Sequence, residues 1–174
     1  MKGSVLMLAA IGAMTALWLA APLAAGSGAG KTVIQIDAVS EGAQSYSGSF
    51  TLERLKGPDY TLVVTGSRDR GTVTGGASSG ADRRTPDGQL YDPVKGTDTL
   101  KGKAGSLVLR WRGRIYDVAG PHAASGAVEA WLGTWSIVRG TGKYAGLKGR
   151  GRYAGIVKVC CKFTRRYAGY VASS

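Results

Sequence analysis

The chain after residue 30 consists of short segments in which apolar and polar residues alternate, and it lacks the apolar spacing of amphipathic helices. Such alternation predicts β-strands that bury one face. Glycine-containing turn signals, such as Gly140-Thr141-Gly142, separate several of these segments. We expect strands near residues 33–40, 47–55, 60–66, 70–75, 105–112, 114–118, 128–138, 147–154, 156–164 and 166–171. The pattern therefore predicts an all-β fold, either a barrel or a sandwich.

Two parts of the chain depart from this pattern. Residues 27–32 are rich in small residues and predict a flexible Gly/Ser segment before a single β domain at 33–174. Residues 76–97 show little periodicity and are longer than ordinary connections, so they predict a long loop. A lid over a cavity mouth and an unstructured connection both fit such a loop.

The first residues have the pattern of an export signal. Lys2 precedes a nearly unbroken apolar stretch at 5–21, and Ala24 and Gly26 provide the small residues of a cleavage site. We therefore expect a signal helix at residues 1–26 and a secreted or cell-envelope protein. The alternative is an uncleaved membrane anchor, because the apolar stretch approaches the roughly 20 residues that span a bilayer.

Alternation along the later strands assigns side chains to two faces. Basic residues occupy every second position of several strands, opposite apolar or aromatic residues. The predicted outward basic residues are Arg110, Arg112, Arg114, Lys148, Arg150, Arg152, Lys158 and Lys162. The predicted inward residues, which would line a cavity if the interior is hollow, are Trp111, Trp131, Trp135, Ile137, Tyr153 and Phe163.

The net charge of the chain indicates which partners it could bind. The formal net charge is +12, and the chain from Lys101 onward holds 14 basic residues against two acidic ones, Asp117 and Glu129. Such an excess attracts polyanions, so an anionic polymer or a membrane surface is a candidate partner. Specific recognition of nucleic acid is not expected, because the aromatic residues that would stack on bases occupy the opposite face.

Residues 133–153 resemble the allene oxide cyclase and dirigent class of barrels, especially their secreted bacterial relatives. The shared features are the turn Gly140-Thr141-Gly142, the aromatic residue that follows it, and a returning strand with Gly149 and Gly151. The resemblance implies a single antiparallel barrel of about eight strands around an apolar cavity, without a cofactor. Plant members cyclise an unstable fatty-acid epoxide or steer radical coupling. The matching positions here are glycines and wall residues, so no active-site residue carries over.

Residues that could carry chemistry are few. His122 is the only histidine, and no pattern of ligands at metal-binding spacing accompanies it. Residues 25–32 resemble a phosphate-binding loop, but a strand-like segment follows where that loop requires a helix. We therefore identify no catalytic, metal or cofactor site. Cys160 and Cys161 are adjacent, and a vicinal disulfide, an intermolecular bridge through Cys160 and two free thiols all remain open.

These observations favour a non-enzymatic, secreted barrel that binds a small apolar ligand or acts as an extracellular accessory protein. One alternative is a basic surface adhesin for an anionic cell-envelope polymer. Another is a cofactor-free cyclase or isomerase of the allene oxide cyclase type, which requires a cavity with a buried carboxylate or tyrosine. The sequence does not set the oligomeric state.

Overall fold

The computed structural model describes residues 32–42, 44–56, 63–64, 68–118, 127–158 and 162–173. This part of the chain is almost entirely strand, with one 3-10 turn at Gly142–Tyr144. The strands are β1 (Thr32–Glu41), β2 (Ser45–Lys56), β3 (Val63–Val64), β4 (Asp69–Ser79), β5 (Arg83–Arg84), β6 (Leu90–Gly102), β7 (Gly105–Asp117), β8 (Ala127–Gly140), β9 (Leu147–Lys158) and β10 (Lys162–Ser173). None of the described segments forms a helix of the length and hydrophobicity needed to span a membrane.

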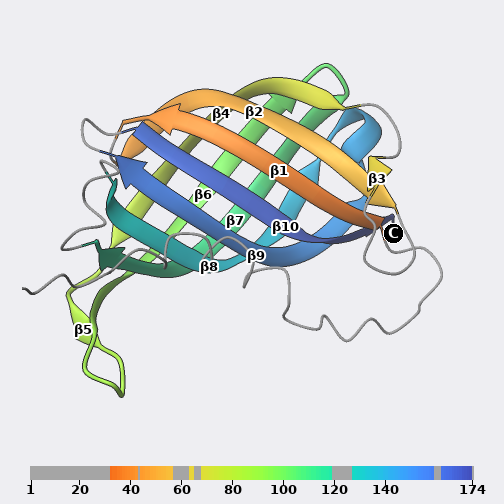
Figure 1. The fold of residues 1–174 in the computed structure, drawn as a ribbon. Helices are drawn as coiled ribbons and strands as arrows, with labels where there is room; N and C mark the ends of the chain where they lie inside the picture. Colours follow the sequence, from red (N-terminus) through yellow and green to blue (C-terminus); the bar gives the residue numbers. More distant parts are fainter. Residues whose placement is uncertain are drawn as a thin grey trace, which may run out of the picture.

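Eight of these strands close into an antiparallel barrel (Figure 1). The order around the ring is β1, β2, β4, β6, β7, β8, β9 and β10, and β10 pairs back onto β1. β3 pairs with β2 and β5 pairs with β6 outside the ring. The predicted single antiparallel barrel of about eight strands is therefore confirmed. The predicted signal helix at residues 1–26 lies outside the described residues.

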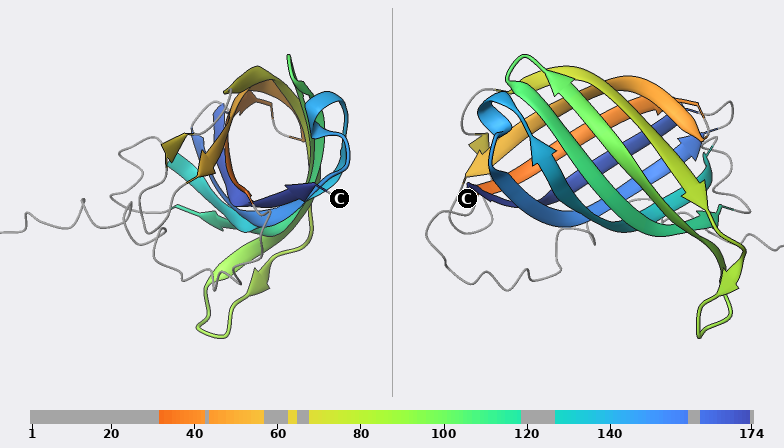
Figure 2. Two further views of the ribbon diagram at one scale, coloured as in Figure 1. Left: turned by 90° about the vertical axis from the view of Figure 1, so that its right-hand side faces the viewer. Right: turned by 180° about the vertical axis from the view of Figure 1, so that it is seen from behind.

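The hydrophobic core of the molecule lies in the interior of this ring, the lumen; Figure 2 (left) shows the ring end-on. Side chains along each strand alternate between the lumen and the outside, as the pleat of a strand requires. In β10, for example, Phe163, Arg165, Tyr167 and Val171 are buried, whereas Thr164, Arg166 and Ala168 are exposed. Buried hydrophobic residues from all eight barrel strands form one cluster, which also includes Tyr144 of the 3-10 turn.

Glycines in the barrel wall make room for the large rings of this core. A Cβ atom on Gly96 would lie 2.3 Å from the ring of Trp111, its partner on the neighbouring strand. A Cβ atom on Gly133 would lie 2.6 Å from the ring of Tyr153. Such separations are far shorter than ordinary contacts, so any larger residue there would displace the ring and the backbone oxygen atom that lies equally close. Part of the high glycine content therefore serves lumen packing.

The segment expected to be a long irregular loop, residues 76–97, is instead mostly strand. β4 continues to Ser79 and β6 begins at Leu90, and the two pair as far as Ser79 opposite Val94. Together with β5 they form a hairpin that projects beyond the barrel end (Figure 2, right). Alternation fades here because a projecting hairpin has no apolar core against which to bury one face.

Two predicted strand breaks are also wrong. The segments at 105–112 and 114–118 form the single strand β7, which runs through Gly113. The predicted break at Gly155 lies within β9, because that strand ends at Lys158 and β10 begins at Lys162. Both glycines lie against rings of the lumen, Tyr153 and Phe163 respectively. Glycine at a position reserved for a neighbour's ring interrupts the apolar pattern without ending the strand.

Candidate functional site

A buried ion pair crosses the lumen. Alternation on β6 places Asp98 inward between Gly96 and Leu100, and alternation on β10 places Arg165 inward. Three strands separate β6 from β10 in either direction around the ring, so the two residues come from opposite walls. Nη1 of Arg165 lies 3.1 Å from Oδ1 and 2.9 Å from Oδ2 of Asp98, and the two side chains are 1% and 0% exposed. The contact therefore ties the two walls together through the core.

Further donors converge on the same carboxylate. The hydroxyl groups of Tyr46 and Tyr167 both donate to Asp98, and Nε1 of Trp111 donates to its Oδ1 at 3.1 Å. Oδ1 thus accepts from three side chains and Oδ2 from two. Nη2 of Arg165 donates to Oγ of Ser40 at 3.1 Å. Charge-assisted bonds of this kind stabilise an ionised carboxylate away from water.

Two buried polar atoms of this cluster have no hydrogen-bond partner among the described residues: Oη of Tyr153 and Nε of Arg165. Both lie among aromatic rings. The guanidinium carbon of Arg165 is 4.2 Å from the ring centre of Tyr46 and 4.5 Å from that of Phe163. The ring of Tyr153 packs at 5.5 Å from Trp111. Hydrogen-bond donors inside an apolar, aromatic lumen are consequently left unused.

Burial also fixes the protonation states in the lumen. Burial first, and then the negative charge of Asp98, raises the pKa of Tyr46 and of Tyr167. Burial raises the pKa of Tyr153 as well. Burial alone would lower the pKa of Arg165, but its interactions with Tyr167 and Asp98 outweigh that effect and raise it. The tyrosines therefore remain neutral donors and Arg165 remains a cation across the ordinary pH range.

A second polar cluster centres on Asp69, at the start of β4. Asp69 on β4 accepts hydrogen bonds from Oη of Tyr144 at 2.8 Å and from the backbone nitrogen atoms of Lys103 and Arg70 at 3.1 and 2.9 Å. These bonds attach the β6–β7 turn and the 3-10 turn to the wall. Burial and the Asp69 carboxylate raise the pKa of Tyr144. The arrangement anchors backbone, so its role is structural.

The six residues predicted to face inward all belong to the buried cluster, at 9% exposure or less: Trp111, Trp131, Trp135, Ile137, Tyr153 and Phe163. Their polar atoms are mostly satisfied. Nε1 of Trp131 donates to Glu129 at 2.7 Å, and Nε1 of Trp135 donates to the carbonyl oxygen of Arg152 at 3.0 Å. The structure thus brings these residues together around the ion pair.

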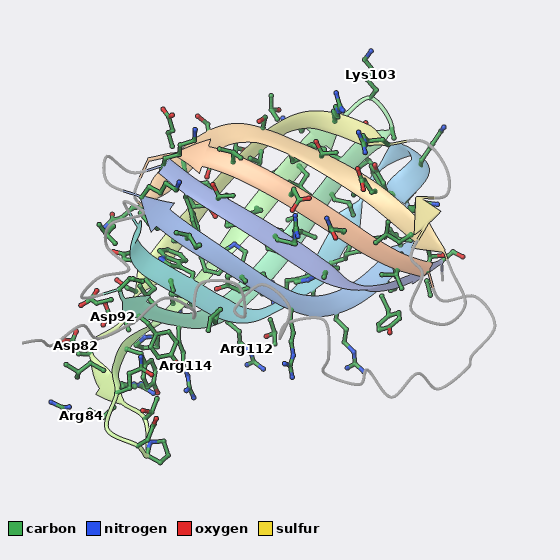
Figure 3. All side chains as sticks on the ribbon, viewed as in Figure 1. Asp82, Arg84, Asp92, Lys103, Arg112 and Arg114 are labelled. Atoms are coloured by element: carbon green, nitrogen blue, oxygen red, sulfur yellow. The ribbon has the colours of Figure 1, made fainter. Side chains whose placement is uncertain are left out.

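The eight basic residues predicted to face outward are all exposed: Arg110, Arg112, Arg114, Lys148, Arg150, Arg152, Lys158 and Lys162. Figure 3 shows Arg112 and Arg114 directed away from the barrel. The ion pairs among the described residues are Arg68–Glu53, Arg165–Asp98 and Arg166–Asp37, so none of the eight has an acidic partner there. A surface groove of about 800 Å³ also lies on this wall, between the projecting hairpin and strands β6, β7 and β8.

Comparisons with known protein families, with curated proteins and with solved structures found no match. The function must therefore be argued from the geometry of the barrel.

The other residues singled out in the sequence lie outside the described part of the chain. These are His122, Cys160 and Cys161. Among the residues that the structure does describe, no group of three or more His, Cys, Asp or Glu side chains could hold a metal ion.

Sequence reasoning missed the ion pair for two separate reasons. Asp98 directly follows the segment interpreted as a loop, and no strand was predicted there, so no face was assigned to it. Arg165 was not assigned to a face because it lies between two predicted strands, 156–164 and 166–171. The parity that places Phe163 inward also places Arg165 inward, and that signal could have revealed a buried arginine, which requires a buried anion.

Proposed function

We propose that the lumen binds a small, mainly apolar molecule that carries at least one oxygen acceptor. The observation that carries this proposal is the pair of buried, unpartnered polar atoms, Oη of Tyr153 and Nε of Arg165. Both can donate a hydrogen bond, and both lie among aromatic rings. A carbonyl, ether, hydroxyl or carboxylate oxygen would satisfy them, while the rings would contact the apolar body of the molecule.

Energetics support this proposal. A buried donor without a partner costs roughly 1–3 kcal/mol, so two of them represent a substantial unused affinity for an acceptor. Arg165 is already held in place by Asp98 and Ser40, so its Nε is preorganised. The resemblance of residues 133–153 to the allene oxide cyclase and dirigent class points the same way, because members of that class enclose an apolar cavity.

The chemistry favours binding over catalysis. Asp98 accepts five hydrogen bonds from four side chains and has little capacity left to take a proton from a substrate. The raised pKa of Tyr153 makes its hydroxyl a weak acid and keeps it neutral. We therefore propose a binding protein rather than a cyclase or isomerase, although the buried carboxylate and tyrosines are the groups such an enzyme would need.

The place of action is part of the same proposal. An export signal at residues 1–26 would deliver the barrel outside the cytoplasm, as a secreted or cell-envelope protein. The denatured mass of protein purified from its own host tests this directly. A chain that starts near Ser27 supports export with cleavage, whereas an intact chain starting at Met1 contradicts it.

Native mass spectrometry of the same material tests the lumen site. We expect an additional mass of a few hundred daltons that is lost on denaturation. As a defined probe, oleic acid should quench the fluorescence of the lumen tryptophans saturably, whereas octadecene, which has no oxygen, should bind more weakly. Tyr153→Phe should weaken oleic acid binding about tenfold, the equivalent of one hydrogen bond of about 1.4 kcal/mol.

The matched control is Tyr170→Phe, because Tyr170 pairs with Arg150 on the outer wall. It should leave oleic acid binding unchanged. Two results together would exclude the proposal. The first is a native mass with no bound molecule, and the second is that the protein binds oleic acid no more tightly than octadecene, or binds neither.

A further inference from the structure

Strand register builds a regular array of arginines on the outer wall. Residues Arg112, Thr134 and Arg152 lie side by side on β7, β8 and β9, and so do Arg110, Ser136 and Arg150 two positions further along. Each row therefore has a hydroxyl residue between two arginines. We call these residues the arginine lattice: Arg110, Arg112, Arg150 and Arg152, with Thr134 and Ser136 between them.

The lattice has a repeat in both directions. Side chains two residues apart on a strand are separated by about 6.8 Å, and residues on strands two apart are separated by about 9.6 Å. Positive charge therefore recurs along the wall rather than converging on one point. A single small anion would contact one or two of these guanidinium groups, whereas a chain with repeated anionic groups could contact all four.

The charge of the lattice is available to a partner. All four arginines are exposed, and none takes part in an ion pair among the described residues. Lys95 lies beside Arg112 and extends the row of Arg112, Thr134 and Arg152 onto β6. Lys95, Arg112 and Thr134 also line the surface groove of about 800 Å³ beside the projecting hairpin. The wall thus combines unpaired positive charge with an adjacent surface groove.

The residues next to the lattice indicate which kind of anionic polymer could bind there. On β10 the residue beside Arg152 is Ala168 and the residue beside Arg150 is Tyr170, so a single ring adjoins the lattice there. Binding of single-stranded nucleic acid relies on several rings on which successive bases stack. A flat membrane would meet the convex wall of a barrel over a narrow line and would leave the groove unused. The occupant that fits is a flexible polymer without bases.

We propose that the arginine lattice binds a linear phosphodiester polymer with a polyol repeat, of the kind found in cell envelopes. The planar guanidinium group donates two parallel hydrogen bonds to a phosphate, which a lysine ammonium group does not. The hydroxyl groups of Thr134 and Ser136 lie between successive arginines and can donate to the same phosphates. This outer site is separate from the lumen site and does not depend on it.

The test measures binding of poly(glycerol phosphate) to the intact protein over a range of salt concentrations. Four phosphate contacts should give a slope of log affinity against log salt of about −3, at about 0.7 per contact for a single-stranded polyanion. The double variant Arg110→Gln/Arg152→Gln should reduce that slope to about −1.4 and weaken binding at least tenfold at low salt. Arg110→Lys/Arg152→Lys should weaken binding while keeping the slope, because only the paired hydrogen bonds are lost.

The matched control is Lys101→Gln/Lys103→Gln, which removes the same charge from two exposed residues. Figure 3 shows Lys103 at the end of the barrel away from Arg112 and Arg114. This control should retain nearly full binding and the full slope. Thermal unfolding of each variant confirms that it is folded, which exposed positions favour.

Three outcomes would overturn the proposal. If the control pair weakens binding as much as the lattice pair, net charge and not the lattice is responsible. If an oligothymidine of equal charge binds more tightly than poly(glycerol phosphate) in a lattice-dependent way, the partner is nucleic acid. If phosphatidylglycerol vesicles bind through the lattice and poly(glycerol phosphate) does not, the partner is a lipid surface.

Discussion

At the scale of single residues, Asp98 and Arg165 determine the character of the lumen. Removing either partner of a buried ion pair leaves the other charged and unpaired in a medium where solvation is poor. The pair is therefore much more sensitive to single substitutions than an ion pair on the surface. The exposed pair Arg68–Glu53 provides a comparison within the same molecule.

We expect Asp98→Asn to lower the free energy of unfolding by about 3–5 kcal/mol, because Arg165 would stay charged in the core. Urea unfolding followed by tryptophan fluorescence measures this. Glu53→Gln, which breaks the exposed pair, should cost less than about 1 kcal/mol. The double variant Asp98→Leu/Arg165→Met should be more stable than Asp98→Asn, and equal losses in the single variants of both pairs would contradict this account.

The residue scale also shows where sequence reasoning succeeds. Trp111 and Arg112 were assigned to the correct faces because alternation depends only on the pleat of the strand. Asp98 could not be assigned in that way, because its inward position depends on a strand that the polar composition around it concealed. The contact between Asp98 and Arg165 depends on ring closure, which no local pattern encodes.

At the scale of strands, glycine and aromatic positions are matched across the barrel wall. Gly96 faces the ring of Trp111 on the next strand, and Gly133 faces the ring of Tyr153. This matching explains why a strand can run through Gly113 without interruption. Glycine lowers the intrinsic stability of a strand, but here it leaves room for an aromatic ring that buries far more apolar surface.

We expect Gly96→Ala to destabilise the barrel by about 1–3 kcal/mol, because the new methyl group would overlap both the carbonyl oxygen of Gly76 and the ring of Trp111. Gly76→Ala is the matched control on the neighbouring strand. Its Cβ atom would meet nothing closer than the carbonyl oxygen of Gln44 at 3.4 Å. It should be neutral or slightly stabilising, and thermal unfolding of the two variants in parallel would reveal the difference. Equal effects would show that the space around Gly96 is not limiting.

The projecting hairpin should be dispensable for folding. Beyond Gly80 its pairing is limited to the short strand β5, and it packs on the barrel mainly through Tyr91 against Tyr116. We expect replacement of residues 82–91 by a two-residue Asn-Gly turn to change the free energy of unfolding by less than about 1 kcal/mol, because no core residue is removed. Urea unfolding measures this, and a loss of several kcal/mol would show that the hairpin belongs to the folding unit.

At the scale of the whole molecule, the buried tyrosines of the lumen make the free energy of unfolding depend on pH in the alkaline range. The pKa values of Tyr46, Tyr153 and Tyr167 are raised in the folded protein above the ordinary value of 10.0. A group with a raised folded pKa contributes stability that is fully present below its unfolded pKa and is lost as the pH rises above it. The stabilising contribution of these tyrosines is therefore complete below pH 10 and declines at higher pH.

We expect the free energy of unfolding to fall above pH 10 by up to about 5 kcal/mol per pH unit, since these three tyrosines and Tyr144, whose pKa is also raised, each contribute about 1.36 kcal/mol per unit. Urea unfolding at a series of pH values measures the slope. Tyr153→Phe should reduce it by about one quarter. Ionisation of all tyrosines in the folded protein near pH 10, seen as tyrosinate absorbance before unfolding, would contradict the raised pKa values.

The pairing of β10 with β1 has a consequence for folding during synthesis. The first and last described strands are neighbours in the ring, so β10 must be synthesised before the ring can close. Until then β1 and β9 are open sheet edges, and Asp98 has no ion-pair partner, because Arg165 lies on β10. Contacts between the ends of a chain form slowly, so completion of the barrel is a late event that follows synthesis.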